Sequence, residues 1–407
     1  MSAARLLQRC DQLAAISVTE GAICRTYLTD EHRRCNQQVM QWMEAAGMHA
    51  YTDAAGNCWG RYPGVEDMEQ ALVLGSHLDT VRNAGRYDGI LGVLAAIEVV
   101  ERFHARGRRF PFHIDVVGFA DEEGSRFGAT LLGSRAVAGQ WDPAWLELRD
   151  ADGIAMAEAF TRFGLDPEQI AQASRAGNKL LGYWELHIEQ GPVLEQRGLP
   201  LGLVSAIAGA RRLQFTLRGR AGHAGTVPME MRRDALVAAA GAVQIVDAQA
   251  RHFGVVATVG KIEARPGSVN VIPGSCHFTL DIRSGDDALR DRALETILRE
   301  IGEHCECAQV AMEYCEIHGA AAVACAPSLL DAGRRALQRC GLEPLSLPSG
   351  AGHDAMAMAA VTDIGMFFLR CREGISHHPD ESVTTEDVAL ALDVLEAAVT
   401  ETENSMI

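Results

Sequence analysis

The chain has 407 residues, of which 48% are apolar and 22% are charged. This composition is typical of a folded globular protein and excludes collagen-like, mucin-like and largely disordered classes. Lys and Arg number 37 against 54 Asp and Glu, so the formal net charge is −17 and nucleic acid and membrane surfaces are poor candidate partners. The length favours two domains, because a single core stops growing near about 250–300 residues.

No stretch of about 18 uninterrupted apolar residues occurs, so the sequence predicts no membrane span. No secretion signal is recognisable at the N-terminus. The 11 cysteines are scattered and form no CxxC pair, which favours free thiols over a disulfide scaffold. We therefore expect a protein of the reducing cytoplasm.

The first part of the chain predicts helices followed by a βαβ unit. Apolar residues at helical spacing, among them Tyr27 and Met43, predict helices in the first ~55 residues. Two continuous apolar runs at 71–75 and 112–120 flank an apolar helical stretch at 89–104, as in a sheet buried on both faces. Both runs stop at polar residues, where open α/β sheets bind their ligands.

The section 209–323 has a different character. Its pattern predicts the order βαββαβ, which is that of a ferredoxin-like α+β module. The predicted strands are 213–217, 254–263, 276–284 and 309–317, and the predicted helices are 232–251 and 286–304. The α/β pattern then resumes with a helix at 329–340, a strand at 365–369 and a helix at 385–400.

We therefore predict an α/β protein of two domains. The larger one is discontinuous, spans 1–208 and 324–407, and contains a mixed, mostly parallel sheet. The smaller one, 209–323, is inserted into it.

Side chains with metal-ligand chemistry gather after the buried strands and near the end of the chain. Each is a weak signal alone, since a single histidine near a strand end is more often structural than a ligand. The alternation of residues along 185–189 predicts that His187 and Glu189 lie on one face of a strand. The candidates are His77, Asp79, Asp88, Glu122, Glu123, His187, Glu189, His353, His377 and His378.

Together these residues indicate a metal site. Imidazole and carboxylate are ligands of Zn, Mn and similar ions, and thiolates are absent from these segments. A dinuclear site needs a bridging carboxylate, and its hydrolytic chemistry needs a further carboxylate that binds no metal and takes a proton from water. The adjacent Glu122 and Glu123 can supply a ligand and a base.

The ordered motifs HLDT, YDG, DEEG, HIEQG, GHAGTVP, VNVIPG, DIRS, SGAGHDA and GISHHP extend the argument. Their order and spacing strongly resemble the hydantoinase/carbamoylase branch of the dinuclear-metal aminoacylase and carboxypeptidase superfamily. That branch contains N-carbamoyl-L-amino acid hydrolases, β-ureidopropionases and allantoate amidohydrolases. The resemblance covers about residues 20–390.

The resemblance implies metal ligands residue by residue. His77 and His187 hold one ion, Glu123 and His377 hold the other, and Asp88 bridges the two. The cofactors implied are two divalent metal ions, Zn or else Mn, Co or Ni.

It also implies the roles of residues next to the ligands. Glu122 is the general base, and Asp79 orients the imidazole of His77. The family pattern has Asn after the ligand histidine where this chain has His378, so His377 and His378 remain alternatives for the ligand.

Substrate contacts follow from the same resemblance. Asn270 and Arg283 bind the substrate carboxylate, although Arg283 taken alone would be interpreted as a charge at a strand end. His223 stabilises the oxyanion from the neighbouring subunit of a homodimer formed through the inserted domain, which acts as a lid. Gln190 contacts the ureido group.

A Gly-rich turn adds the last candidates. Gly352 and His353 are expected to line the substrate pocket.

We therefore expect a metal-dependent amidohydrolase that cleaves the linear ureido C–N bond of an N-carbamoyl-L-amino acid or of allantoate. It would release ammonia, and CO2 from carbamoyl amino acids. The alternative within the same superfamily is a dipeptidase or N-acyl-L-amino acid hydrolase. His187 argues against it, because peptidase relatives carry an acidic residue there. A non-catalytic binding protein of the same fold would be expected to have lost a ligand or the base.

Overall fold

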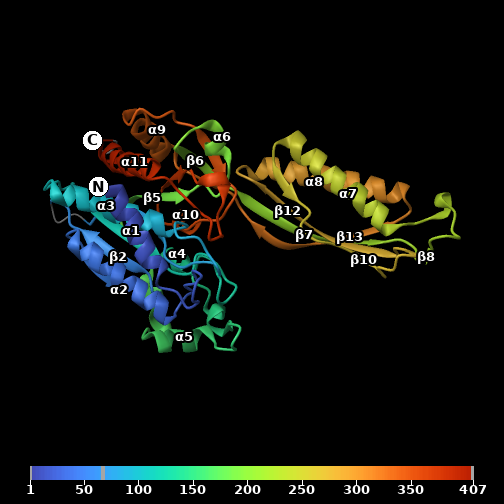
Figure 1. Ribbon diagram of the computed structural model, residues 1–407, viewed down its shortest axis with the longest axis horizontal. Helices are drawn as coiled ribbons and strands as arrows, with labels where there is room; N and C mark the ends of the chain where they lie inside the picture. The colour runs from blue at the N-terminus through green and yellow to red at the C-terminus, as the bar shows by residue number, and fades with distance from the viewer. Residues whose placement is uncertain (1, 66–68, 405–407) are drawn as a thin grey trace. The chain divides into compact units, whose positions relative to one another are not determined.

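The computed structural model describes residues 2–65 and 69–404, and the chain forms two compact units (Figure 1). Unit 1 comprises Met1–Ser205, Ala324–Leu347 and Ala351–Ile407, and unit 2 comprises Ala206–Val323 and Pro348–Gly350. Each unit has its own hydrophobic core.

Unit 1 is built on a nine-stranded mixed sheet with the order β1-β2-β4-β3-β5-β16-β6-β14, and β15 pairs with β6. Its four central strands run parallel, whereas β1, β2 and β6 pair antiparallel with their neighbours. The prediction of a mixed α/β sheet with a parallel centre is therefore confirmed. The strands are β1 (His49–Thr52), β2 (Cys58–Tyr62), β3 (Ala71–His77), β4 (His113–Phe119), β5 (Leu180–Ile188), β6 (Leu201–Ile207), β14 (Val323–Ala324), β15 (Ser346–Ser349) and β16 (Ile364–Leu369).

Helix α3 (Ile90–Ala105) is the central helix of unit 1. Twelve of its 16 residues are buried, because it packs against the strands β3, β4 and β5 and against helices α1 (Ser2–Ala14) and α11 (Thr385–Asn404). Residues 90–97 are apolar on every face, and such a segment must be covered on more than one side. The close approach to β5 depends on Gly92, where an added Cβ would lie 2.1 Å from the carbonyl oxygen of Leu186.

The other helices of unit 1 cover the sheet and its loops. They are α2 (Asp30–Ala45), α4 (Leu132–Val137), α5 (Met156–Phe163), α6 (Val193–Arg197), α9 (Pro327–Arg339) and α10 (Ala355–Met358), with 3-10 turns η1 (Pro143–Glu147), η2 (Pro167–Ala173) and η4 (Arg372–Gly374). Among the described residues, no helix has the length and apolar character needed to cross a bilayer.

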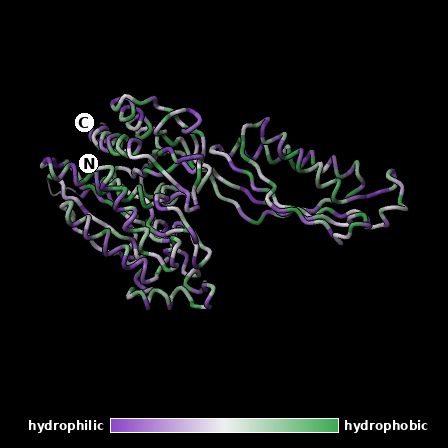
Figure 2. The backbone as a smooth tube through the Cα atoms, in the orientation of Figure 1, coloured by the Kyte–Doolittle hydropathy of each residue, from purple (hydrophilic) through white to green (hydrophobic). Residues whose placement is uncertain are grey.

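Unit 2 has a sheet of order β10-β12-β7-β13, with β9 also paired to β12, and two long helices. Both helices contact β12, whose residues alternate between buried and part-exposed. The tube of unit 2 shows the matching mixture of hydrophobic and hydrophilic colours along its helices (Figure 2). Its elements are β7 (Gly209–Arg218), β8 (Gly222–His223), η3 (Met229–Met231), α7 (Ala235–Phe253), β9 (Val256–Thr258), β10 (Ile262–Arg265), β11 (Val271–Ile272), β12 (Ser275–Ser284), α8 (Asp287–Cys307) and β13 (Ala311–Ala320).

Two sequence predictions of local structure were wrong. The single strand at 254–263 is two short strands, because β9 pairs Thr258 with Asp281 whereas β10 pairs Ile262 with Phe278, which leaves one residue more on this side of the ladder. Tyr27 lies outside α2, since the Thr29 hydroxyl accepts the N–H of His32 and begins the helix after it.

The contact between α3 and β5 gives a test of the packing. Gly92→Ala should destabilise the protein by about 1–3 kcal/mol, because the methyl group meets backbone that cannot move aside. The matched control is Gly302→Ala in α8, where the new Cβ meets only the end of Met312 at 3.7 Å. That change should be neutral or stabilise by up to about 1 kcal/mol through helix propensity. Urea unfolding of both variants measures the difference, and equal effects would contradict the packing argument.

Candidate metal centre

Side chains from four places in the chain converge at the carboxyl end of the parallel strands of unit 1. His77 is the last residue of β3 and His187 lies at the end of β5. Asp88 follows β3, Glu123 follows β4 and His377 follows β16. Adjacent parallel strands end at one edge of a sheet, so residues far apart in sequence meet there.

The ligand atoms form two groups that share one carboxylate. His77, Asp88 and His187 form one, and Asp88, Glu123 and His377 form the other, with all atoms of a group within 4.8 Å of one another. Asp88 Oδ1 lies 3.0 Å from Nε2 of His187 and 3.6 Å from Nε2 of His77. Asp88 Oδ2 lies 3.0 Å from Nε2 of His377, which is 3.3 Å from Glu123 Oε1. A carboxylate whose oxygens face different donor groups is suited to bridge two ions.

Main-chain carbonyls set the tautomers of two imidazoles. Nδ1 of His77 lies 3.1 Å from the carbonyl oxygen of Asp79, and Nδ1 of His187 lies 2.9 Å from that of Ile188. A carbonyl can only accept, so each Nδ1 carries the proton and each Nε2 is left to bind an ion. This donor set fits divalent metal ions with imidazole and carboxylate preferences.

The charge balance of the cluster points the same way. Burial raises the pKa of Asp88, but hydrogen bonds from His187, His377 and His77 lower it more, so its pKa lies well below the usual value. Burial lowers the pKa of His77, yet its hydrogen bond to Asp88 and the charge of Glu122 raise it well above 6.5. Divalent cations can replace the protons that these imidazoles otherwise hold, so binding should release protons.

Gly89 allows His77 to stand against the first turn of α3. Its φ of +70° is in the left-handed region, and an added Cβ would lie 2.4 Å from atoms of the His77 ring. The residue before the central helix therefore also leaves the space in which the His77 ring, a candidate ligand, lies.

Glu122 stands beside the ligand groups. It forms a third group with His77 and Glu123. Removal from solvent raises its pKa well above the usual value, the charge of His77 lowers it, and Glu123 and Asp354 raise it further. Bound cations would lower this pKa and leave an ionised carboxylate available as a base.

Asp79 contributes to the site in a way that the sequence did not predict. Its carboxylate lies 3.7 Å from Nδ1 of His77, and the hydrogen bond to that ring comes instead from its main-chain oxygen. The carboxylate accepts hydrogen bonds from the main-chain N–H of Glu122 at 3.0 Å and of Glu123 at 3.2 Å. One residue therefore orients both the imidazole and the turn that carries the two glutamates.

Of the two adjacent histidines, His377 reaches the cluster. Its φ of +57° turns the chain so that the ring faces Asp88 and Glu123. His378 points to its own neighbour instead, with Nδ1 accepting the N–H of Asp380 at 3.2 Å.

Other predicted residues of unit 1 lie next to the ligands. The Gln190 side-chain amide donates to Asp88 Oδ2 and to Ser376, each at 3.1 Å. Gly352 faces Glu122, whose Oε1 would lie 3.8 Å from an added Cβ. His353 is buried, with its ring centroid 4.5 Å from that of His187.

Alternation did not predict the position of Glu189 correctly. Strand β5 ends at Ile188, so Glu189 leaves the face of His187 and caps helix α6, where it accepts the N–H groups of Val193 and Leu194.

The three substrate-contact candidates of the inserted section belong to unit 2. His223 in β8 neighbours Asn270, because the N–H of Ala224 donates to the carbonyl of Asn270 at 3.0 Å. Nδ1 of His223 accepts the N–H of Gly225, so the neutral ring carries its proton on Nε2. Arg283 in β12 donates from Nε and Nη2 to the two oxygens of Asp281 and from Nη1 to the carbonyl of Gly350.

Sequence reasoning missed two buried carboxylates behind the ligands. Glu185 accepts the Ser76 hydroxyl at 2.7 Å and the N–H of Ala355 at 3.1 Å. Glu381 contacts the loops of Asp88 and His377. The available signals were the Glu-x-His spacing in β5 and the glutamate four residues after His377.

Comparison with known proteins places this site in a family. The description "Peptidase family M20/M25/M40" matches residues 73–401. The chain belongs to that family. It is 42% identical over 393 residues to an N-carbamoyl-L-amino acid amidohydrolase of Geobacillus stearothermophilus, covering 96% of each chain. It is 38% identical over 409 residues to allantoate deiminase 1 of Glycine max, covering 93% of this chain and 85% of that protein.

A solved structure agrees with these relatives. An amidase of the hydantoinase/carbamoylase family from Burkholderia multivorans aligns with a TM-score of 0.92 and 33% identity over 98% of both chains. The predicted branch and the prediction of an amidohydrolase are therefore confirmed.

The geometry of the two adjacent histidines gives a direct test. His377→Ala should reduce the bound zinc from two ions per chain to one, because Asp88 and Glu123 alone are a poor site. His378→Ala is the matched control and should retain both ions, since its ring faces Asp380. Metal analysis after gel filtration in zinc-buffered solution measures both. A loss of zinc in the His378 variant alone would contradict the assignment.

Proposed function

We propose that this amidohydrolase cleaves the linear C–N bond of an N-carbamoyl-L-amino acid or of the related ureido acid allantoate. The observation that carries the proposal is Asp88, whose two oxygens face separate ligand groups beside the carboxylate of Glu122. This arrangement would suit metal-assisted hydrolysis by an activated water. The relatives described above are named for these two substrate classes.

The proposed ligands are His77 and His187 on one side of Asp88, and Glu123 and His377 on the other. Two divalent ions held there, Zn or else Mn, Co or Ni, would polarise the ureido carbonyl and lower the pKa of the attacking water.

Glu122 moves the protons of the reaction. As a carboxylate it accepts one proton from the attacking water, while the oxygen of that water bonds to the ureido carbon. It then gives this proton to the nitrogen that leaves when the C–N bond breaks. The carboxylate of Asp79 accepts the main-chain N–H of Glu122 and so keeps Glu122 in place.

Substrate contacts are proposed residue by residue, as the family resemblance implies. Arg283 and Asn270 would bind the substrate carboxylate, and the hydrogen bonds from Arg283 to Asp281 and Gly350 support a fixed guanidinium with N–H groups to spare on both Nη atoms. His223 of the neighbouring subunit would donate its Nε2 proton to the oxyanion. Gln190 would contact the ureido group, and Gly352 and His353 would line the pocket.

We also propose that unit 2 is a ferredoxin-like lid and dimerisation domain, and that the protein is a homodimer. Strand β13 supports this, because it is a ten-residue edge strand with Tyr314 and Ile317 about half exposed, at 50% and 57%. A cytoplasmic location is supported by the cysteines, all 11 of which are free.

A dipeptidase or N-acyl-L-amino acid hydrolase is the alternative within the family. Parallel turnover assays with allantoate, N-carbamoyl-β-alanine, N-carbamoyl-L-amino acids, N-acetyl-L-amino acids and dipeptides separate these substrates. Release of ammonia from at least one ureido acid, with no comparable dipeptide cleavage, supports the proposal, and the opposite preference would refute it.

The role of Glu122 predicts a specific loss. Glu122→Gln should lower kcat by about 10²–10⁴-fold, because the amide cannot accept the proton of water. The zinc content should stay at two ions per chain, since Glu122 is not a proposed ligand. Steady-state kinetics and metal analysis test this together, and near-normal turnover would show that another group is the base.

The role of Arg283 predicts an effect on binding. Arg283→Ala should raise KM for carboxylate-bearing ureides by about 10–100-fold, as expected when a charged hydrogen bond is lost. Arg212→Ala is a suitable control, since Arg212 also bonds to Asp281 and lies on the paired strand β7. Its KM should change little. An equal rise in KM of Arg283→Ala for a ureide without a carboxylate would contradict the proposed contact.

A further inference from the structure

A buried carboxylate outside both ligand groups connects the loops that carry Asp88 and His377. Glu381 is only 4% exposed. Its Oε1 accepts hydrogen bonds from the main-chain N–H of Tyr87 at 2.7 Å and of Asp88 at 3.2 Å, partners that are 294 and 293 residues away in the chain. Its Oε2 lies 3.2 Å from the hydroxyl of Ser376, the residue before His377. One side chain therefore bonds to the backbone of one ligand and to the neighbour of another.

Ser376 connects Glu381 to the ligand cluster. Its hydroxyl lies 3.0 Å from Asp88 Oδ2, and it has one proton to give to either carboxylate. The Gln190 amide donates to both Ser376 and Asp88. The position of the His377 loop is thereby tied to the oxygen of Asp88 that faces His377.

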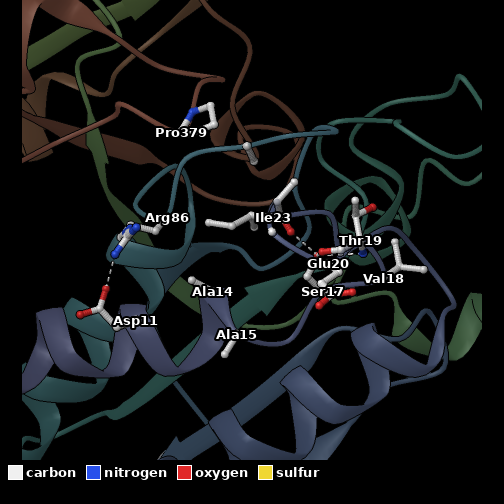
Figure 3. Close-up of a pocket in the computed structure, with 13 residues that line it drawn as sticks. Asp11, Ala14, Ala15, Ser17, Val18, Thr19, Glu20, Ile23, Arg86 and Pro379 are labelled. Atoms are coloured by element: carbon white, nitrogen blue, oxygen red, sulfur yellow. Dashed lines mark hydrogen bonds and ion pairs between the residues drawn. The ribbon is translucent and has the colours of Figure 1, made fainter.

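The two loops border a cavity and also meet in one close contact. Arg86 and Pro379, one from each loop, line the same cavity of about 720 Å³ (Figure 3). Gly85 makes room for the carboxylate, since an added Cβ would lie 2.2 Å from the Glu381 carboxyl carbon. Glu381 therefore joins the two loops both through hydrogen bonds and through its contact with Gly85.

The two ligand groups differ in how they are fixed. His77 and His187 lie in strands and have their Nδ1 atoms bonded to main-chain carbonyls. His377 lies on a loop with φ of +57° and its side chain is 48% exposed. The group with His377 is therefore the one whose geometry depends on contacts between loops.

We propose that Glu381 is a positioning residue that sets the separation of Asp88 and His377 and so determines how tightly the ion of the Asp88–Glu123–His377 group is held. The inference rests on the dinuclear centre of the proposed function, but it is independent of the substrate. Glu381 acts through the main chain of Asp88 and through Ser376, and it binds no ion itself.

Zinc binding to the full-length protein tests this without any assay of activity. Bound zinc per chain is measured across chelator-buffered zinc concentrations for the wild type, Glu381→Ala, Glu381→Gln and Asp380→Ala. In Glu381→Ala the ion of the Asp88–Glu123–His377 group, the second ion, should bind about 10–100-fold more weakly, as for other groups that orient ligands. The first ion, beside His77 and His187, should be weakened less, because these two histidines lie in strands and not on the loops that Glu381 joins. Asp380→Ala is the matched control, because this exposed neighbour faces only His378. It should behave as the wild type.

Glu381→Gln should restore most of the affinity for the second ion. Its amide oxygen can accept both main-chain N–H groups, and its NH2 can donate to Ser376, which then gives its own proton to Asp88. A general loss of protein stability would weaken the binding of both ions alike, and Glu381→Gln would not restore the affinity for the second ion alone.

Three results would overturn the inference. The first is an unchanged affinity for the second ion in Glu381→Ala. The second is an equal loss of affinity for both ions in that variant, and the third is a loss of affinity of the same size in Asp380→Ala. If Glu381→Ala does not fold, Ser376→Ala provides the test, since it removes the hydroxyl that lies between Glu381 and Asp88. An unchanged affinity for the second ion in that variant would then refute the role of Glu381. A wild type that binds fewer than two ions would instead refute the dinuclear centre.

Discussion

The structure of the site depends on one carboxylate placed between two sets of imidazole and carboxylate donors. Asp88 Oδ1 faces His187 and His77, and Asp88 Oδ2 faces His377. Such a concentration of donors and negative charge away from water is costly unless cations offset it. The fold meets this need at the carboxyl edge of the parallel strands, where loops from distant parts of the chain come together.

A layer of hydrogen bonds behind the ligands holds this arrangement. Asp79 receives the N–H groups of Glu122 and Glu123, and its own carbonyl fixes the tautomer of His77. Glu381 receives the N–H of Asp88 and meets the hydroxyl next to His377. Neither Asp79 nor Glu381 is a proposed contact of the substrate. Asp79 bonds to the turn that carries the proposed base, and Glu381 bonds to the main chain of the candidate ligand Asp88.

The sequence predicted the parts of the structure that have local signals. Continuous apolar runs revealed β3, β4 and α3, and the residue chemistry at the strand ends indicated a wider set of candidate ligands. The family resemblance selected His77, Asp88, Glu123, His187 and His377 from that set, and the structure brings these five together. Contacts between distant loops have no such signal. The link from Glu381 to Asp88, the turn that removes Glu189 from the face of β5, and the break between β9 and β10 each depend on the path of the backbone.

The central claim, that Asp88 is shared between two ions, is tested most directly by anomalous diffraction from crystals of the zinc-loaded protein. We expect two zinc peaks about 3.5–4 Å apart. One should lie against His77 and His187, the other against Glu123 and His377, with an oxygen of Asp88 bound to each. A single peak, or two peaks without Asp88 between them, would contradict the claim.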